Sequence, residues 1–400
     1  MNNTLLTPGA APFGLAENAE ASRGTLRLAV LCDLPEENWP SMDLVAEMLL
    51  AQLHAAHAPE VQATRIRPRM RRRLSVLPFV GKRQACFNAD RLLNRLWDYP
   101  RQLRGRTGDF DRFHIADHSY AQLVHHLPAE RTGVFCHDLD AFRCLLEPRR
   151  EPRPRWFRRM MRHVLRGLER AAVVFHSTAE VRRRIEHWGL LDPARLVQAP
   201  YGTSPEYVPE PPGDEELTTP VPGRTGRPFL LHVGSCIARK RIDVLIDLLA
   251  AARALWPELV LVQIGGQWTA AQQAQIDRLG VGEAVIQQGG LDRRNLAMLY
   301  RRAALVVQPS DAEGFGLPVI EALACGGIVV ASDIPVLREV GGPAAVYCPV
   351  GDVPRWAETV CRLLGDPAAA PDRATRLAQA QRFSWASHAR TILEAYQRLE

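Results

Sequence analysis

Two glutamates with a glycine-containing loop between them are the side chains in this chain best suited to chemistry. Glu313 and Glu321 lie in the segment PSDAEGFGLPVIEALACG, residues 309–326. Gly314 and Gly316 allow a loop whose backbone N–H groups lie bare against a ligand, and the following residues have the apolar spacing of a helix. Such a segment offers amide donors and a positive helix end to phosphates, and carboxylates to hydroxyl groups. A sugar nucleotide is a ligand of this kind.

A basic pair lies between an apolar strand and a helix. The run FLLHV, residues 229–233, predicts the strand, and GSCIARKR connects it to an apolar helical pattern. Arg239 and Lys240 therefore follow the carboxyl end of a strand, together with Gly234 and Ser235. This is the usual anion-binding position in α/β sheets, although a solvated basic turn gives the same pattern. Gly265 follows a further strand in the same way.

The elements that must position these residues alternate between short apolar strands and helical patterns, which predicts the α/β class. The length of 400 residues suits two domains. A stretch rich in Pro, Gly and acidic residues, 204–226, is the best linker. We therefore expect a disordered tail over 1–24, an acceptor-side domain over 25–203, a donor-nucleotide domain over 227–382 and a final helix over 383–400 that crosses back to the first domain.

Composition indicates an ordinary cytoplasmic globular protein, with 46% hydrophobic and 24% charged residues. The first 24 residues lack a basic region followed by an apolar core, so they do not read as a secretory signal. No apolar run is long enough to span a bilayer. The eight cysteines are scattered without a C-x-x-C pair, which favours buried thiols over disulfides or zinc.

The spacing from Glu313 to Glu321, with GFGLP between them, strongly resembles the signature of the family 4 glycosyltransferases. The resemblance is strong over about 229–350 and weaker before it. It implies the GT-B fold, in which two Rossmann-like domains face each other across a cleft. It also implies transfer of a sugar from a UDP- or GDP-sugar to a glycan or lipid-linked acceptor with retained anomeric configuration. Synthesis of bacterial surface polysaccharide follows by analogy.

The same resemblance implies roles for particular residues. Arg239 and Lys240 would stabilise the leaving diphosphate, Glu313 would orient the sugar hydroxyls, and His137 would contact the sugar near the reacting carbon. Glu321 would hold the ribose hydroxyls. We expect neither a metal ion nor a cofactor, because the cations stabilise the diphosphate directly. The expected donor-binding residues are Gly234, Ser235, Arg239, Lys240, Gly265, Gly314, Phe315, Gly316, Leu317 and Glu321.

Two places depart from the family pattern. The loop after the first strand, CDLPEENWPS, carries no glycine, so Glu37, Asn38 and Trp39 are candidates for the acceptor instead. Tyr201-Gly202 stands where the family often has Asn-Gly.

Two arginine-rich segments have alternative interpretations. Residues 65–73 are either a solvated loop or a contact for anionic headgroups or a phosphorylated acceptor. Residues 149–170 combine nine arginines with apolar residues at helical spacing. That pattern favours packing against the core, with a secondary role on an anionic membrane surface at the inner face of the plasma membrane. No nucleic-acid motif accompanies the charge, so we expect no nucleic-acid partner.

Two other functions share the expected fold. A sugar-nucleotide epimerase would need further acid–base residues. A non-catalytic subunit that binds a nucleotide sugar or a membrane would not need the intact basic pair and glutamates.

Overall fold

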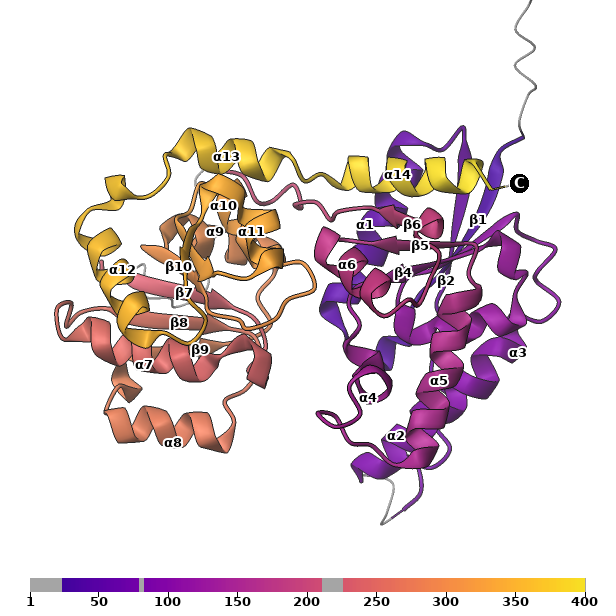
Figure 1. Ribbon diagram of the computed structural model, residues 1–400, viewed down its shortest axis with the longest axis horizontal. Helices are drawn as coiled ribbons and strands as arrows, with labels where there is room; N and C mark the ends of the chain where they lie inside the picture. The colour runs from indigo at the N-terminus through magenta and orange to yellow at the C-terminus, as the bar shows by residue number, and fades with distance from the viewer. Residues whose placement is uncertain (1–23, 79–82, 211–225, 400) are drawn as a thin grey trace, which may run out of the picture.

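Two parallel β-sheets of six strands each form the centres of two domains (Figure 1). This computed structural model describes residues 24–78, 83–210 and 226–399. The first sheet has the strand order β2-β1-β3-β4-β5-β6, and the second has the order β12-β11-β10-β7-β8-β9. The predicted α/β class with two Rossmann-like domains is confirmed.

The strands of the first sheet are β1 (Leu26–Leu31), β2 (Val61–Ile66), β3 (Arg112–Ile115), β4 (Thr132–Cys136), β5 (Val173–His176) and β6 (Leu196–Gln198). Those of the second sheet are β7 (Phe229–Val233), β8 (Val260–Ile264), β9 (Val285–Gln288), β10 (Leu305–Gln308), β11 (Val329–Ser332) and β12 (Val346–Cys348). Central strands such as β4 and β10 are buried along their whole length, because helices cover both faces of a parallel sheet.

Helices of the first domain are α1 (Pro40–Ala56), α2 (Gln84–Leu93), α3 (Tyr99–Leu103), α4 (Arg143–Leu146), α5 (Arg155–Arg170) and α6 (Ala179–His187). Those of the second are α7 (Ile242–Arg253), α8 (Ala270–Leu279), α9 (Arg293–Arg302), α10 (Leu317–Ala324), α11 (Pro335–Gly341), α12 (Val353–Gly365) and α13 (Arg373–Gln381). The last helix, α14 (Trp385–Gln397), runs along the first domain and packs against α1 and β6 (Figure 1).

Strand order fixes where each sheet can hold a ligand. In the second sheet the chain runs outward from β7 to β9 and then returns to β10 on the other side of β7. In the first sheet the same reversal falls between β1 and β3. At such a reversal the connections after neighbouring strands diverge, and they leave a crevice at the carboxyl ends.

Three sequence predictions meet the structure differently here. Most of the expected linker (211–225) and of the tail (1–23) lies outside the described residues. The edge strand β2 was not expected, because its sequence VQATRI carries polar residues on its exposed side. Helix α5 buries Met161, Val164, Leu165 and Leu168 against the segment His118–His126, so its apolar side packs inward as expected.

Contacts of α14 with β3 and β4 generate a stability prediction. The hydroxyl of Tyr396 donates to the backbone oxygen of Phe113 (3.1 Å) and lies 3.0 Å from Nδ1 of His114. Tyr396→Phe should therefore lower the free energy of unfolding by about 1–3 kcal/mol, because both buried groups lose their partner. Chemical denaturation measures this loss. Glu394→Ala removes only an exposed pair on the same helix and should change stability by less than about 0.5 kcal/mol.

Candidate functional site

A cavity of about 1330 Å³ lies between the two domains and is lined by residues of both. The first domain contributes the segments that follow β3 and β4, including His118 and His137. The second contributes the segments that follow β7, β8 and β10, including Gly234, Gly265 and Glu313. Both crevices predicted by the strand order therefore open into one cleft.

A buried carboxylate paired with two cations lies on the second-domain side of the cleft. Glu313 Oε1 accepts a hydrogen bond from Lys240 Nζ (2.6 Å), and Oε2 accepts one from Arg239 (3.0 Å). Gln308 Nε2 (2.9 Å) and the Ser310 hydroxyl (2.7 Å) also donate to Oε1. The structure thus brings Glu313 together with a basic pair that lies more than 70 positions earlier in the sequence.

Charge pairing decides the protonation state of this group. Burial alone would raise the pKa of Glu313, but the charges of Lys240 and Arg239 lower it to about 2. The carboxylate is therefore ionised at neutral pH. Two cations and one anion leave a net charge of +1 at the edge of the cavity, which attracts an anionic ligand.

The N-terminus of α10 lies bare beside this cluster. Gly316 precedes the helix with φ +98°, and no side chain caps the helix start. Its backbone conformation suits glycine, and an added Cβ would lie 2.8 Å from Leu337. Leu317 is the first residue of this uncapped helix and also lines the cavity. The helix start can therefore provide the expected backbone N–H donors for an anion.

The loop before α10 also touches the first domain. A Cβ on Gly314 would lie 2.9 Å from the backbone oxygen of His137, and the hydroxyl of Ser177 donates to the oxygen of Gly314 (3.2 Å). Phe315 is buried and packs on Tyr201, with ring centroids 4.7 Å apart. The side chain of Phe315 thus joins the domains while it lines the cavity.

Glu321 is a buried residue of α10 that lines the cavity. The hydroxyl of Tyr300 donates to its carboxylate (2.9 Å), and Tyr207 packs edge-on against Tyr300. Burial raises the pKa of Glu321 to about 7. This carboxyl group lines the cavity, and no cation of the described residues forms an ion pair with it. Burial of an unpaired carboxyl group costs free energy, and groups with a strongly shifted pKa are often found at binding sites.

The remaining donor-side residues lie at the ends of β7 and β8. Gly234, Ser235 and Gly265 all line the cavity. Gln263 donates from Nε2 to the backbone oxygen of Gly234 (2.7 Å), which holds the two strand ends together. Gly265 has φ +96°, and a Cβ there would lie 3.1 Å from the oxygen of Gly234, so this close approach requires glycine.

His137 lines the cavity, but both of its ring nitrogens bind the protein. Nε2 donates to the backbone oxygen of Ala116 (2.8 Å), so Nδ1 accepts from the hydroxyl of Tyr201. Burial lowers the pKa of His137, which keeps the ring neutral in this arrangement. The departure from Asn-Gly at position 201 supplies the hydroxyl that occupies Nδ1.

A second histidine, His118, lies in the same wall of the cavity and was not selected from the sequence. The backbone N–H of His137 donates to Nδ1 of His118 (3.3 Å), and Asp117 Oδ1 also lies 3.3 Å from Nδ1. The other ring nitrogen is Nε2. That nitrogen lies 3.7 Å from Asp138 Oδ1 and has no hydrogen-bond partner among the described residues. Its only sequence signal was a position directly after strand β3.

The acceptor-side residues separate into two groups. Asn38 and Trp39 line the cavity, and Trp39 is 53% exposed. The carboxylate of Glu37 is buried instead, where it accepts from the hydroxyl of Tyr120 (2.9 Å) and pairs with Arg95 (3.4 Å). The structure therefore brings Asn38 and Trp39 to the cleft and turns Glu37 into the first domain.

Residues 24–78, 83–210 and 226–399 contain no group of three or more His, Cys, Asp or Glu side chains arranged to hold a metal ion. No helix in these ranges combines the length and apolar character that crossing a membrane requires.

Comparison with known proteins identifies relatives of this chain. Residues 214–382 match the family model described as glycosyl transferases group 1. The chain is 28% identical over 330 residues to O-antigen chain mannosyltransferase B of Escherichia coli, covering 81% of this chain and 83% of that protein. It is 35% identical over 223 residues to D-inositol 3-phosphate glycosyltransferase 1 of Catenulispora acidiphila. That alignment covers 49% of this chain and about half (53%) of the relative.

Solved structures resemble the whole chain. Sucrose-phosphate synthase from Thermosynechococcus elongatus superposes with a TM-score of 0.71 and 19% identity, covering 94% of this chain and 99% of that one. Anabaena HepE in complex with UDP and glucose gives a TM-score of 0.67 and 16% identity, covering 94% and 100%. These likenesses confirm the predicted GT-B fold.

The raised pKa of Glu321 generates a test of the site's energetics. Its pKa is about 7 in the folded chain against an ordinary value of 4.5, so the folded state holds the proton more tightly. Stability from this group is therefore present below pH 4.5 and is lost as pH rises through about 7. Glu321→Gln should raise the free energy of unfolding by roughly 3 kcal/mol near pH 8 and change it little near pH 4.

Urea denaturation of both proteins across this pH range measures the difference, in which all other titrating groups cancel. Equal stability of the two proteins at every pH would show that Glu321 titrates normally.

Proposed function

We propose that this chain, whose residues 214–382 match the glycosyl transferases group 1 model, is a glycosyltransferase of the GT-B fold that moves a sugar from a nucleotide-diphosphate sugar to a glycan or lipid-linked acceptor with retained anomeric configuration. The observation that carries this proposal is the combination of Arg239, Lys240 and the bare N-terminus of α10 on one wall of the cleft. These groups match the charge of a leaving diphosphate.

On the donor side, Arg239 and Lys240 stabilise the diphosphate as the bond between the sugar and its phosphate breaks. The amide groups at the start of α10 add further donors at the same place. Glu313 holds both cations in position through contacts of 3.0 and 2.6 Å. When the donor binds, we propose that the diphosphate shares these cations and that Glu313 orients the sugar hydroxyls.

Glu321 is our candidate for the ribose hydroxyls. A carboxylate accepts two hydrogen bonds from neighbouring hydroxyls, and Tyr300 holds Glu321 in place from behind (2.9 Å). Glu321 lies about one turn inside α10, which suits a nucleotide that lies along this helix with its phosphates at the helix start.

Near the reacting carbon we propose that His118 makes the polar contact that the resemblance gives to His137. Both nitrogens of His137 are occupied, whereas Nε2 of His118, a buried nitrogen, has no hydrogen-bond partner among the described residues. His137 then acts as a positioning residue, because its backbone N–H contacts Nδ1 of His118 (3.3 Å). Asn38 and Trp39 are the proposed acceptor contacts.

The relatives support a role in bacterial surface polysaccharide synthesis, because one of them is named as an O-antigen chain mannosyltransferase. We propose a cytoplasmic protein that associates peripherally with the inner face of the plasma membrane, in part through 149–170. The exposed arginines of this segment suit an anionic surface.

An assay of donor hydrolysis with a panel of UDP- and GDP-sugars tests the proposed function. Slow release of UDP or GDP from one donor, accelerated by an acceptor, is the expected result. Conversion of the donor to its epimer would indicate an epimerase instead. Donor binding without turnover would indicate a non-catalytic subunit.

Lys240→Ala should lower turnover by roughly two to three orders of magnitude, the usual effect of removing one preorganised charge contact from a leaving group. Steady-state release of the nucleotide measures this change. Arg241→Ala is the matched control, because Arg241 pairs with Asp243 (2.8 Å) and is absent from the cavity wall. Wild-type turnover in the Lys240 variant would remove this cation from the mechanism.

His118→Ala should lower kcat/KM for transfer by roughly tenfold or more, as expected for the loss of one hydrogen bond to a reacting group. The affinity for the free nucleoside diphosphate should stay unchanged, because His118 lies on the opposite wall. His125→Ala serves as control, since His125 stacks on His163 away from the cleft. A wild-type rate in the His118→Ala variant would show that His118 does not make the polar contact near the reacting carbon.

A further inference from the structure

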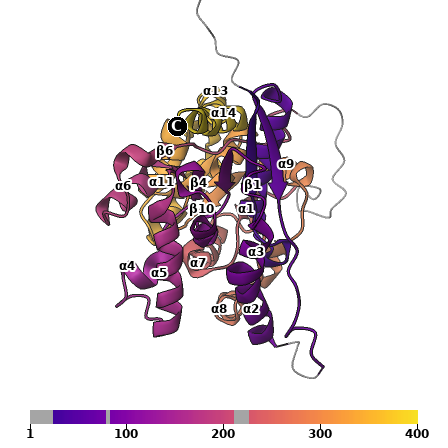
Figure 2. The same ribbon diagram turned by 90° about the vertical axis from the view of Figure 1, so that its right-hand side faces the viewer.

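Exposed apolar side chains gather at one end of the first domain, far from the crossing helix α14. Val76 is 63% exposed, Trp97 56% and Trp156 61%. We call the group the tip surface, and it consists of Val76, Leu77, Leu93, Leu96, Trp97 and Trp156. Both views show α2 and the start of α5 at the same end of the molecule (Figures 1 and 2). Isolated exposed apolar residues are ordinary, but a group of them on neighbouring elements indicates an interaction surface.

The exposed charged side chains around the tip surface are arginines. The segments that carry it, 67–78, 83–101 and 147–160, contain four acidic residues, of which Asp90 and Asp98 are buried and the others half-buried. Exposed arginines on the same segments include Arg69, Arg71, Arg72, Arg83, Arg155 and Arg159. The outward face is therefore cationic, because its carboxylates point inward or pair locally.

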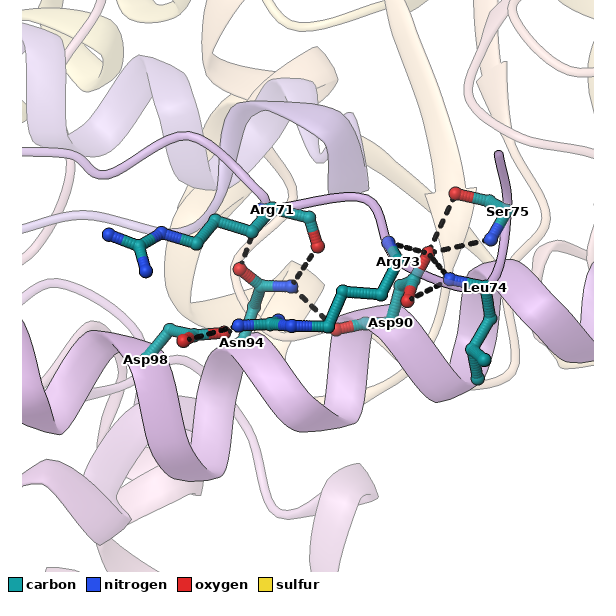
Figure 3. Close-up of polar contacts among 7 residues, drawn as sticks. All are labelled: Arg71, Arg73, Leu74, Ser75, Asp90, Asn94 and Asp98. Atoms are coloured by element: carbon teal, nitrogen blue, oxygen red, sulfur yellow. Dashed lines mark hydrogen bonds and ion pairs between the residues drawn. The ribbon is translucent and has the colours of Figure 1, made fainter. Parts of the chain in front are cut away.

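A set of polar contacts, which we call the clasp, fixes the loop that precedes Val76 and Leu77 (Figure 3). One carboxylate oxygen of Asp90 accepts the backbone N–H groups of Arg73 (3.1 Å) and Ser75 (2.9 Å). Both of its oxygens accept the N–H of Leu74 (2.9 and 3.1 Å). Burial would raise the pKa of Asp90, but the hydrogen bonds from Leu74 and Ser75 lower it to about 2.

Two further residues of the same helical face complete the clasp. Asn94 accepts from the N–H of Arg71 (2.7 Å) and donates to its backbone oxygen (2.9 Å). Asp98 pairs with the guanidinium of Arg73 through two bonds of 2.7 and 2.8 Å. Figure 3 shows the guanidinium of Arg71 extending sideways, apart from Asn94 and the other clasp contacts. The clasp thus fixes the backbone of residues 71–75 in a position that leaves the next two side chains, Val76 and Leu77, exposed.

The tip surface continues into the cleft. Leu96 and Trp156 belong both to the tip surface and to the cavity wall. Leu92, Phe157 and Met160 extend that wall between the two helices, and each of them lines the cavity. An apolar path therefore connects the exposed end of the domain with the side of the cleft opposite the donor residues.

We propose that the tip surface docks on the interfacial region of an anionic lipid bilayer. Resting on the proposed function, this inference also specifies the acceptor as a lipid-linked molecule that enters the cleft along Leu92, Leu96, Trp156, Phe157 and Met160. Tryptophan with an apolar body and polar edge suits the level of the headgroups, and arginines attract anionic lipids at about 1 kcal/mol each. A water-soluble anion would explain the arginines but not the exposed apolar residues.

Sedimentation of the full chain with vesicles tests the proposal. The vesicles contain phosphatidylcholine alone or phosphatidylcholine mixed with phosphatidylglycerol, and no nucleotide sugar is present. We expect retention on the mixed vesicles, weaker retention at high salt and little on the neutral ones. The double variant Val76→Asp, Leu77→Asp should partition at least roughly tenfold less strongly, because it places two charges where apolar residues enter the interface.

Leu255→Asp is the matched control, since Leu255 is 73% exposed on the second domain and should keep wild-type retention. Wild-type retention of the double variant, equal loss in the control, or equal binding to neutral vesicles would overturn the proposal. Because vesicle binding needs no donor and donor hydrolysis needs no vesicle, its failure is distinguishable from failure of the transferase function.

Discussion

The pairing of one buried carboxylate with two cations is the interaction on which the cleft depends. Taking Glu313 and Lys240 out of water costs several kcal/mol for each ion, and only close pairing offsets this cost. The contacts of 2.6 and 3.0 Å from Lys240 and Arg239 provide it. They exist because β7 and β10 are neighbours in the sheet, so the connections that follow them meet. A leaving diphosphate would find these cations already in place and already partly free of water.

A second constraint ties the same loop to the other domain. Gly314 approaches the backbone of His137 so closely that a larger residue would collide, and Phe315 packs on Tyr201. The loop therefore serves two purposes, since it presents the helix start to the cleft and sets the separation of its walls. The hydroxyl of Tyr201 contacts one nitrogen of His137, so His137 has both ring nitrogens bonded, whereas Nε2 of His118 has no hydrogen-bond partner among the described residues.

The first domain shows how stability and surface character are linked. Asp90, Asn94 and Asp98 follow each other at intervals of four, so they share one face of the helical segment. Their side chains satisfy the backbone of the loop 71–75, which has no strand partner there. The two carboxylates are buried in contacts with this loop, and most of the arginines of the same segments remain exposed. The amphiphilic end of the domain thus follows from how the loop is held, not from composition alone.

Local patterns were enough to predict the α/β class, the two domains, the strand after which Arg239 and Lys240 lie, and the glycine loop before α10. These features depend on side-chain periodicity and on backbone conformations that few residue types adopt. Both properties are determined by residues that are close together in the sequence. The strand β2, the inward turn of Glu37, the occupied nitrogens of His137 and the free one of His118 were not predictable in this way. Each depends on partners between about 20 and 80 residues away, which come together only when the sheets assemble.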